Sequence, residues 1–468
     1  MRRLIGMTVA VGALLPAAPG LHAAEPASYD ELKVQLQQAM RTNKDMQKRA
    51  ETPERQQRAA PAVAAPAGAA TGATGATAVT VPAAQPAGAP VVSPNAMAQE
   101  GAPESDQARV ELYGHAMLDA IYDFKRMNPS WSATMRPSQI PVTCPGDAGC
   151  GKDGASVFSV RQSSLGFRAF IPTTLGQIKT DVSFDLFGTD GGTNVHWLNV
   201  WAELGAFGAG QYYSNFMDID VFPNTVDYWG PSGMVFLRNP QLRYTPYQKD
   251  GMKFAVSLEA PNSVLDTGKL SEVDPAFGAG VAPWNRLPDA IASFRLDRDW
   301  GHLRAAGIVR QVGYQFPNTP AGNPSGHKTG YGLNLSGAVK VMAKDSVTWQ
   351  VAAGNAIASY ANDGGVDLAP GADLRAETVP SVGWLLYYNH YWSEKWSSSI
   401  GYSEHRQSNT DGQLGSAFRK GSYASGNLLF YPVKNVTTGL EYIWGQRENK
   451  DGSSAPDYRL QFSTKVTF

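Results

Sequence analysis

The chain ends in YRLQFSTKVTF, residues 458–468, where apolar and polar side chains alternate. Successive side chains of a β-strand point to opposite faces, so this stretch predicts a strand with one apolar and one polar face. The same alternation occurs in residues 176–188 and 436–447. No long stretch between residues 109 and 468 shows helical periodicity. This region is therefore predicted to be all-β.

Sixteen such segments are predicted, and they differ in how they are connected. They cover residues 109–124, 157–171, 176–188, 195–206, 208–216, 234–247, 251–260, 289–299, 301–312, 328–341, 345–359, 379–392, 396–408, 420–431, 436–447 and 457–468. Short turns alternate with long loops rich in Gly, Pro, Asn and Asp. This alternation, with strands of about ten residues, is typical of a transmembrane β-barrel.

A soluble β-sandwich is the alternative fold. The polar faces of the segments carry many charges, which a sandwich core excludes and a water-filled barrel interior accepts. The apolar faces end in aromatic side chains, as membrane girdles do: Tyr388, Trp392, Trp396, Tyr402, Trp444 and Phe468. In a bilayer only a closed barrel pairs every backbone group of a sheet. We therefore predict a 16-stranded antiparallel transmembrane β-barrel over residues 109–468, with both ends on the periplasmic side.

Composition excludes several other classes of protein. The 468 residues carry a formal net charge of −1, whereas nucleic-acid-binding domains are basic, so no nucleic-acid partner is expected. No apolar run reaches the ~18 residues that a membrane-spanning helix needs. Two cysteines exclude a Cys₄ metal site, and we expect neither a metal nor a cofactor. Cys144 and Cys150 lie close together in a secreted chain and are predicted to form a disulfide.

Residues 1–24 are predicted to be a secretory signal peptide. Arg2 and Arg3 precede an apolar stretch, and small residues follow it. A buried N-terminal helix is the alternative, which two prolines in this stretch oppose. The mature protein is therefore expected outside the cytoplasm.

Residues 25–52 are predicted to form a periplasmic coiled-coil helix. Seam residues recur at spacings of three and four, and one polar position can fix the register. The seam includes Leu32, Leu36, Asn43 and Met46. A solvated monomeric helix is the alternative, although so short a helix is marginal alone in water. Residues 53–108 are rich in Ala, Pro and Gly and predict a disordered linker.

Three short stretches resemble the general bacterial porins. They are the opening Val110-Glu111-Leu112-Tyr113-Gly114, then Ser164-Leu165-Gly166-Phe167-Arg168, and the terminal Phe468 with Tyr458 and Phe462. The heptads followed by a barrel are more narrowly similar to the DcaP-like porins. That resemblance implies trimerisation through the periplasmic helix, a preference for anions such as dicarboxylates, and Phe468 as part of the signal read by the barrel-insertion machinery.

The function expected from this pattern is passive diffusion of small hydrophilic solutes across the outer membrane by a homotrimer. Its expected partners are outer-membrane lipid and lipopolysaccharide, the insertion machinery and small anionic solutes. A barrel hydrolase is one alternative, but no set of nucleophile, base and orienting residue stands out in the sequence. A structural tether between outer membrane and cell wall is the other. We expect no enzymatic activity and assign no catalytic residues.

The alternation rule also predicts which charges face the barrel interior. The basic set is Arg168, Arg243, Lys253, Arg295, Arg304 and Arg310. The acidic set is Glu111, Asp119, Asp123, Asp181, Asp185 and Glu203. The two sets lie mostly on different strands and predict a transverse field, with Arg243, Arg295 and Arg304 contributing most to anion preference. By resemblance, loop 217–233 folds inward and its Asp218, Asp220 and Asp227 face the basic wall.

Overall fold

The computed structural model describes residues 107–147, 149–273, 281–317, 324–342 and 344–468. The predicted signal peptide, the coiled-coil helix with Leu32, Leu36, Asn43 and Met46, and nearly all of the linker lie outside these residues. No helix in the described ranges is long and apolar enough to span a membrane.

Most described residues lie in strands, which turns and long loops with a few short helices connect. The strands are β1 (Arg109–Asp123), β2 (Ala155–Ser159), β3 (Ser164–Thr173), β4 (Gly176–Phe187), β5 (Thr193–Leu204), β6 (Phe207–Tyr213), β7 (Arg238–Lys249), β8 (Met252–Glu259), β9 (Ala282–Pro283), β10 (Asp289–Arg298), β11 (Gly301–Gln315), β12 (Ser325–Lys340), β13 (Ser346–Asn355), β14 (Leu368–Pro370), β15 (Ala376–Thr378), β16 (Pro380–Ser393), β17 (Trp396–Gln407), β18 (Phe418–Phe430), β19 (Val436–Asn449) and β20 (Ser454–Thr467). The helices are η2 (Pro129–Trp131), η3 (Pro137–Gln139), η4 (Ile219–Val221), α3 (Leu270–Val273) and η5 (Ala358–Tyr360).

The main sheet closes on itself. Apart from β2, β9, β14 and β15, each strand pairs antiparallel with the next along the chain, and β1 pairs with both β3 and β20. The short β2 and β3 pair with successive parts of β1, and β9 and β10 pair with successive parts of β11. Counting each of these two pairs as one strand, the barrel has sixteen strands. The predicted all-β, 16-stranded antiparallel barrel is confirmed. β14 and β15 form a separate two-stranded hairpin in a loop.

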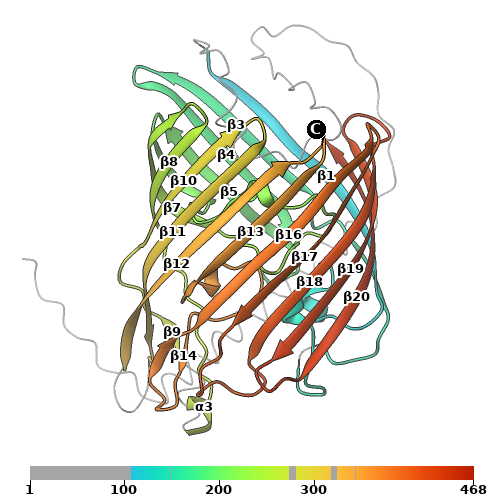
Figure 1. Ribbon diagram of the computed structural model, residues 1–468. Helices are drawn as coiled ribbons and strands as arrows, with labels where there is room; N and C mark the ends of the chain where they lie inside the picture. The colour runs from blue at the N-terminus through green and yellow to red at the C-terminus, as the bar shows by residue number, and fades with distance from the viewer. Residues whose placement is uncertain (1–106, 148, 274–280, 318–323, 343) are drawn as a thin grey trace, which may run out of the picture. The chain divides into compact units, whose positions relative to one another are not determined.

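The two edges of the barrel differ, as the sequence predicted. Phe468 and Gly114 exchange backbone hydrogen bonds of 3.0 and 3.1 Å, which seals the ring near the start of β1. The tight turns, such as that between β3 and β4, lie at the same edge as the C-terminus (Figure 1). The long loops and α3 lie at the opposite edge (Figure 1).

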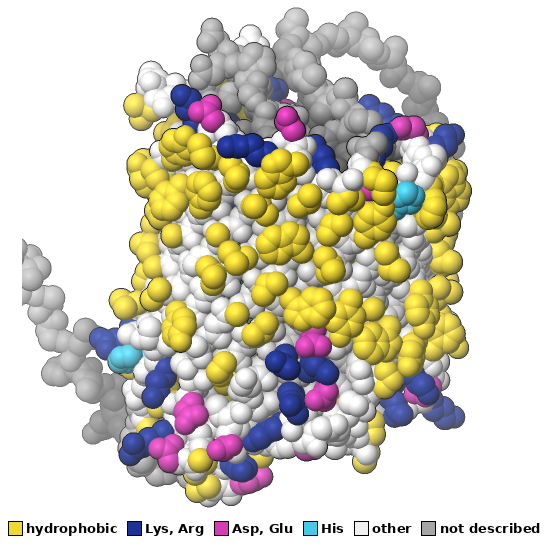
Figure 2. Space-filling view, in the orientation of Figure 1, with side chains coloured by type: hydrophobic (Ala, Val, Ile, Leu, Met, Phe, Trp, Pro, Cys, Tyr) yellow, Lys and Arg dark blue, Asp and Glu magenta, His cyan; other side chains and the backbone are white. Residues whose placement is uncertain are grey.

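The outer face of the barrel is apolar. Outward side chains such as Leu333, Val309 and Ile400 are exposed. Figure 2 shows hydrophobic side chains over the middle of the visible face, while charged side chains gather towards its edges. This is the surface expected of a barrel whose outer face contacts lipid.

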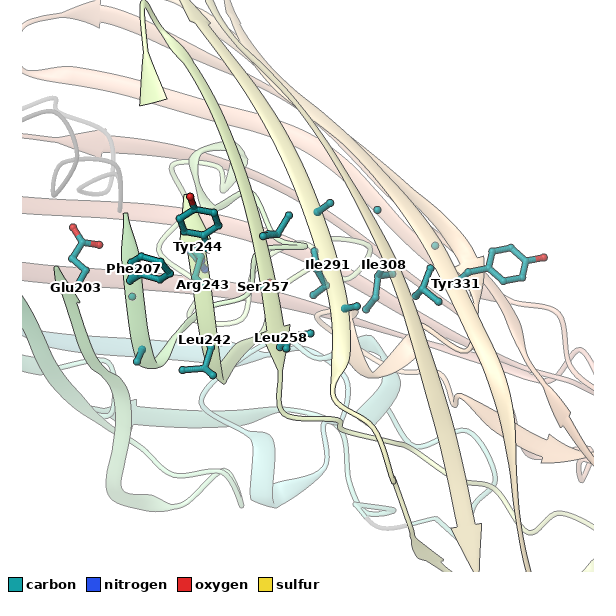
Figure 3. Close-up of a pocket in the computed structure, with 18 of the residues that line it drawn as sticks. Glu203, Phe207, Leu242, Arg243, Tyr244, Ser257, Leu258, Ile291, Ile308 and Tyr331 are labelled. Atoms are coloured by element: carbon teal, nitrogen blue, oxygen red, sulfur yellow. The ribbon is translucent and has the colours of Figure 1, made fainter. Parts of the chain in front are cut away.

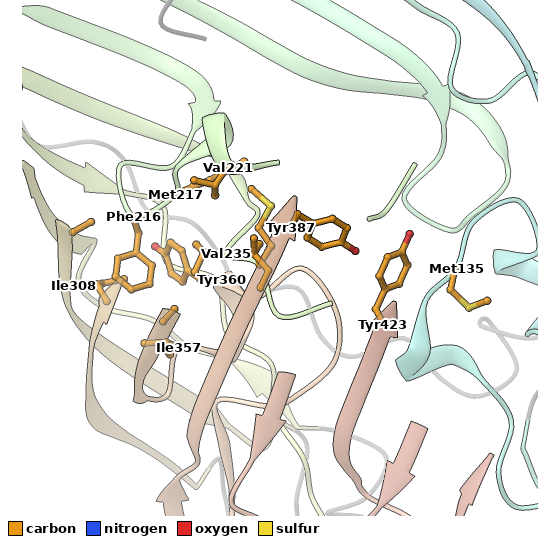
Figure 4. Close-up of a cluster of buried hydrophobic side chains, with 14 of the residues drawn as sticks. Met135, Phe216, Met217, Val221, Val235, Ile308, Ile357, Tyr360, Tyr387 and Tyr423 are labelled. Atoms are coloured by element: carbon orange, nitrogen blue, oxygen red, sulfur yellow. The ribbon is translucent and has the colours of Figure 1, made fainter. Parts of the chain in front are cut away.

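The interior is not lined by polar side chains alone. A cluster of buried apolar side chains lies inside the ring, where three loops meet the wall (Figure 4). Met135 comes from the loop after β1, Phe216 and Met217 from the loop after β6, and Tyr360 from the loop after β13. They pack against inward wall residues that include Ile308, Leu385, Tyr387, Tyr423 and Ile443. Part of the barrel is therefore filled by its own loops.

Strand boundaries follow the prediction closely, with two informative differences. The predicted 345–359 segment ends as a strand at Asn355 and continues into η5, because the chain turns into the barrel there. The predicted 234–247 segment becomes a strand only at Arg238, since residues 234–237 belong to the inward loop. The predicted Cys144–Cys150 disulfide is present, with 5.6 Å between the Cα atoms.

Candidate functional site

The loop between β6 and β7, residues 214–237, crosses the barrel interior. Near its start, Asn215 donates its backbone N–H to Glu259 on β8 at 2.7 Å. Further along, Val226 donates its N–H to Glu441 on β19 at 2.6 Å, and Gln461 on β20 donates to the Val226 carbonyl at 2.9 Å. The loop is thus hydrogen-bonded to well-separated parts of the wall, as the resemblance to porins implied.

The returning half of this inward loop lies directly on the wall. Gly233 donates its N–H to the Ser403 hydroxyl at 2.8 Å. A Cβ added at Gly383 on β16 would lie 2.4 Å from the Gly233 carbonyl oxygen. Only glycine at position 383 permits this close backbone approach, because any larger residue would collide with the loop.

Three cations lie side by side on the wall that faces the start of the loop. Arg295 on β10 is directly opposite Lys253 on β8 and directly opposite Arg304 on β11. Side chains at opposed positions of an antiparallel pair are close neighbours, and like charges there are destabilising. A row of three cations is therefore costly for folding, which is common at functional sites.

Arg295 is the member of this row whose charge is compensated. Its guanidinium contacts Asp220 at 2.6 Å, Asp297 at 2.8 Å and Asp218 at 3.3 Å. Asp218 also lies 2.9 Å from His302 Nε2 and accepts a hydrogen bond from Ser336 at 2.7 Å. Burial alone would raise the pKa of the Asp218 carboxyl, but His302 together with Arg295 and Arg304 holds that pKa below its usual range.

Asp218, Asp220 and His302 have a spacing that a metal ion could bridge. The Arg295 guanidinium already contacts both carboxylates of this group. A second cation there would meet the charge of Arg295 and of the nearby Arg304, so this group is best explained as the anchor of the loop to the basic wall.

Arg243, Lys253 and Arg304 are not compensated in this way. Within the described ranges none of the three has a carboxylate within ion-pair distance. Arg304 donates to the Asn215 carbonyl at 2.9 Å, and Arg243 donates to Gln241 and to the Tyr213 carbonyl. We name these three residues the cation triad. The hydrogen-bond acceptors of Arg243 and Arg304 are neutral, and the carboxylates of Glu203 and Asp218 act on the triad only from beyond ion-pair distance, so much of its positive charge stays available to a solute.

The cation triad lines a cavity of about 170 Å³ beneath the inward loop. The same cavity is lined by Glu203, Asp218 and Asp220, and by Arg295, Lys179, Trp201, Tyr212 and Tyr213. Of the predicted interior charges, it therefore brings together Arg243, Lys253, Arg295 and Arg304 with Glu203, Asp218 and Asp220. Asp218 and Asp220 face the basic wall.

Sequence reasoning missed Lys179 and the aromatic members of the cavity wall. Trp201 has the same parity as Glu203 on β5, and Lys179 the same parity as Asp181 on β4. The alternation of side chains along a strand therefore already predicts that Trp201 and Lys179 point into the barrel. Tyr212 and Tyr213 end β6 where the chain enters the loop, a place that periodicity does not mark.

The remaining predicted acidic residues face inward but are covered or paired. Asp181 accepts from Tyr113 at 2.5 Å and lies 3.6 Å from Arg168, and Asp185 accepts from Tyr228 at 2.5 Å. Glu111 pairs with Arg109 at 2.9 Å. Asp119 accepts from Ser463 at 2.7 Å, and Asp123 pairs with Arg459 at 2.6 Å. These charges support the wall and loops rather than the cavity.

Two predicted roles need correction. Arg310 does not line an open interior: its side chain is fully buried, 3.1 Å from Asp289 and 3.6 Å from Asp367, because the loop after β13 covers it. Asp227 does not face the basic wall. It accepts hydrogen bonds from Thr134 and from the Met135 N–H at 2.9 and 3.0 Å, because the loop has crossed the interior by this point.

A larger groove lies on the outside of the barrel and is not part of this site. It has a volume of about 1310 Å³ and is lined by outward apolar residues of neighbouring strands, among them Phe207, Leu242, Tyr244, Leu258 and Tyr331 (Figure 3). Small outward residues, such as Ala290 and Ala292 on β10, make the hollow. Its apolar lining is that of a lipid-facing surface.

Comparisons with known proteins agree with this architecture. A family model described as DcaP outer membrane protein matches residues 90–272. The outer membrane channel DcaP of Acinetobacter baumannii shares the fold with a TM-score of 0.67 at 21% identity, over 77% of this chain and 97% of that chain. No curated protein matches the chain.

More distant barrels are also similar. An anion-selective porin from Comamonas acidovorans has a TM-score of 0.49 at 8% identity, over 77% of this chain and 100% of that chain. OmpF of Salmonella typhi has a TM-score of 0.47 at 11% identity, over 77% and 97%. The family match over residues 90–272 and the fold shared with the Acinetobacter channel agree with the resemblance that the sequence indicated.

Proposed function

We propose that the protein is an outer-membrane porin for small hydrophilic solutes, with a preference for anions such as dicarboxylates. The observation that carries this proposal is the cation triad: Arg243, Lys253 and Arg304 line one cavity inside the barrel without an ion-paired carboxylate among the described residues. The match to DcaP outer membrane proteins supports the porin assignment.

The physical basis of the preference is the focusing of charge in a narrow space. A pore with low-dielectric walls concentrates the field of the charges that line it, so uncompensated cations raise the local concentration of anions. Arg295 contributes less than its position implied, because Asp218, Asp220 and Asp297 surround it. Lys253 takes its place as the third selectivity residue.

The test is ion selectivity in planar bilayers. Under a KCl gradient, the sign of the reversal potential should show that chloride permeates more readily than potassium. Changing the triad to glutamine, Arg243→Gln with Lys253→Gln and Arg304→Gln, should move the reversal potential towards cations. It should also slow a dicarboxylate more than a neutral sugar of similar size. Equal slowing of both solutes would show that these residues only shape the cavity.

Arg406→Gln is the matched control. This residue is exposed on β17 between the inward His405 and Gln407, so its side chain faces outwards. The variant removes one cation from the chain without changing the interior. It should leave the reversal potential where it is in the unmodified protein.

Bilayer recording also separates the two other functions. A hydrolase acting at the barrel loops, or a tether reaching the cell wall, predicts no solute-dependent conductance. A tether, moreover, gives no reason for three uncompensated cations in one cavity. Steady single-channel currents would therefore favour the porin over both.

The assembly belongs to the same proposal. We infer a secreted chain with a signal peptide over residues 1–24, a helix over 25–52 that associates three copies in the periplasm, and a linker over 53–108. Outer-membrane lipid and lipopolysaccharide would surround the apolar exterior, and the insertion machinery would read the C-terminal strand.

A further inference from the structure

One carboxylate in the cavity differs from the others. Glu203 on β5 has a side chain that is 32% exposed, and its nearest cation, Lys179, is 3.9 Å away. It also accepts a hydrogen bond from the Trp201 indole N–H at 3.3 Å. Asp218 and Asp220, by contrast, are held tightly by Arg295. Glu203 is the cavity carboxylate that a solute can best reach.

Glu203 and Arg243 lie in the same cross-strand row. Glu203 is opposite Gly208 on β6, and Gly208 is opposite Arg243 on β7. The backbones of β5 and β7 are two strand spacings apart, which is roughly 10 Å. Gly208 contributes no side chain, and the Trp201 ring lies over it. The Glu203 carboxylate and the Arg243 guanidinium therefore lie on either side of the Trp201 ring.

This spacing fits a small solute that carries both charges. An ammonium group hydrogen-bonded to Glu203 and a carboxylate hydrogen-bonded to Arg243 each take about 3 Å. The few ångströms that remain suit the two to three carbon atoms of an acidic amino acid. A second carboxylate of such a solute would meet Lys253 and Arg304, which line the same cavity.

We propose that the cavity is selective for dipolar anions, namely acidic α-amino acids, with Glu203 receiving the ammonium and the cation triad receiving the carboxylates. This inference rests on the proposed porin function and refines its solute class. Glu203 is a specificity residue in this scheme, because it repels simple dicarboxylates and attracts those that carry an amine.

The experiment compares succinate with aspartate, which differs from it by one α-amino group. Fluxes are measured in proteoliposomes at neutral pH. Glu203→Gln should lower the aspartate-to-succinate flux ratio by roughly fivefold, the factor for about 1 kcal/mol from one partly exposed ion pair. The succinate flux should rise, because the variant removes a repelling charge. N-acetylaspartate, whose amine is blocked, should behave like succinate.

Two further variants make the result specific. Glu203→Asp keeps the charge and should retain more of the aspartate preference than Glu203→Gln. Glu111→Gln removes the same charge from an inward position on β1 outside the cavity lining and should leave the flux ratio unchanged. Folding of each variant is checked by the shift in gel mobility on heating.

The outcomes also separate this inference from the proposed function. If Glu203→Gln leaves the flux ratio unchanged while Arg243→Gln slows both solutes, the dipolar selectivity is wrong and the anion porin stands. A ratio that falls equally in Glu111→Gln would likewise overturn the role of Glu203. If the unmodified protein shows no anion preference at all, the proposed function itself fails.

Discussion

At the scale of single residues, the charge of Arg310 stabilises the fold through buried ion pairs. Its guanidinium is buried between Asp289 and Asp367, and it donates to Ser359 at 2.7 Å and to the Ala356 carbonyl at 3.1 Å. Arg310→Met would leave two buried carboxylates without their cation, at a cost of about 3–5 kcal/mol. We expect the barrel to unfold at a lower temperature, measured by loss of heat-modifiable gel mobility.

The control for Arg310 is Arg406→Met. Arg406 is exposed on the outer face, and surface substitutions usually change stability by less than about 0.5 kcal/mol. Equal melting temperatures for the two variants would show that the buried ion pairs at Arg310 do not hold the loop after β13.

The direction of the cavity residues could be predicted from sequence, but their charge compensation could not. Alternation alone places Arg243, Lys253, Arg295 and Arg304 on the inner face. The distinction between Arg295 and the other three depends on Asp218, which is 77 residues away in a loop without periodicity. Such a contact is a property of the folded loop, and no local pattern encodes it.

At the scale of elements, the inward loop depends on two glycines in contact. A Cβ at Gly383 would lie 2.4 Å from the Gly233 carbonyl oxygen. Gly383→Ala should therefore push the loop away from β16 and into the open side of the barrel, at a cost of about 1–3 kcal/mol. We expect lower single-channel conductance in planar bilayers, with the barrel still folded.

Gly426→Ala provides the matched comparison for this loop contact. A Cβ at Gly426 would have its nearest neighbour, Ile400, at 3.7 Å, which is ordinary contact. This variant should conduct like the unmodified protein. Unchanged conductance in Gly383→Ala would mean that the loop does not set the width of the channel.

The closing strand supplies a second prediction at this scale. Phe468 seals the ring through its backbone bonds to Gly114, and a Cβ at Gly114 would lie 3.1 Å from the Phe468 ring. Deleting Phe468 removes the last pair of the β1–β20 seam and, by resemblance to porins, part of the insertion signal. We expect much lower levels in outer-membrane fractions by immunoblot, and normal levels would contradict that role.

The elements themselves show what alternation can and cannot specify. All sixteen barrel strands were predicted because a lipid-facing strand must alternate along its length. The filling of the interior by loops was not predicted. The apolar residues concerned lie in a loop, where hydrophobic residues follow no regular spacing: Phe216, Met217, Met234 and Val235. The apolar residues that stand next to one another in this loop were the available signal.

At the scale of the whole molecule, the predicted N-terminal helix should act on assembly rather than on barrel folding. Deleting residues 25–52 removes the predicted seam from Leu32 to Met46 and leaves every described barrel contact in place. The barrel should fold, while the trimer should dissociate at a lower temperature on native gels. Identical dissociation temperatures would contradict the coiled coil.

The anion preference of the whole channel should also depend on salt. The cation triad lines a cavity in which Glu203 and Arg243 lie on strands two spacings apart, about 10 Å. The Debye length is about 10 Å at 0.1 M salt and about 3 Å at 1 M, so the field spans the cavity only in the dilute case. The anion-to-cation permeability ratio from reversal potentials should therefore fall towards one as KCl rises across this range. In the Arg243→Gln, Lys253→Gln and Arg304→Gln variant, the ratio should start lower and change little. A ratio that stays constant in the unmodified protein would place the source of selectivity in size or hydrogen bonding rather than in the charge of the cation triad.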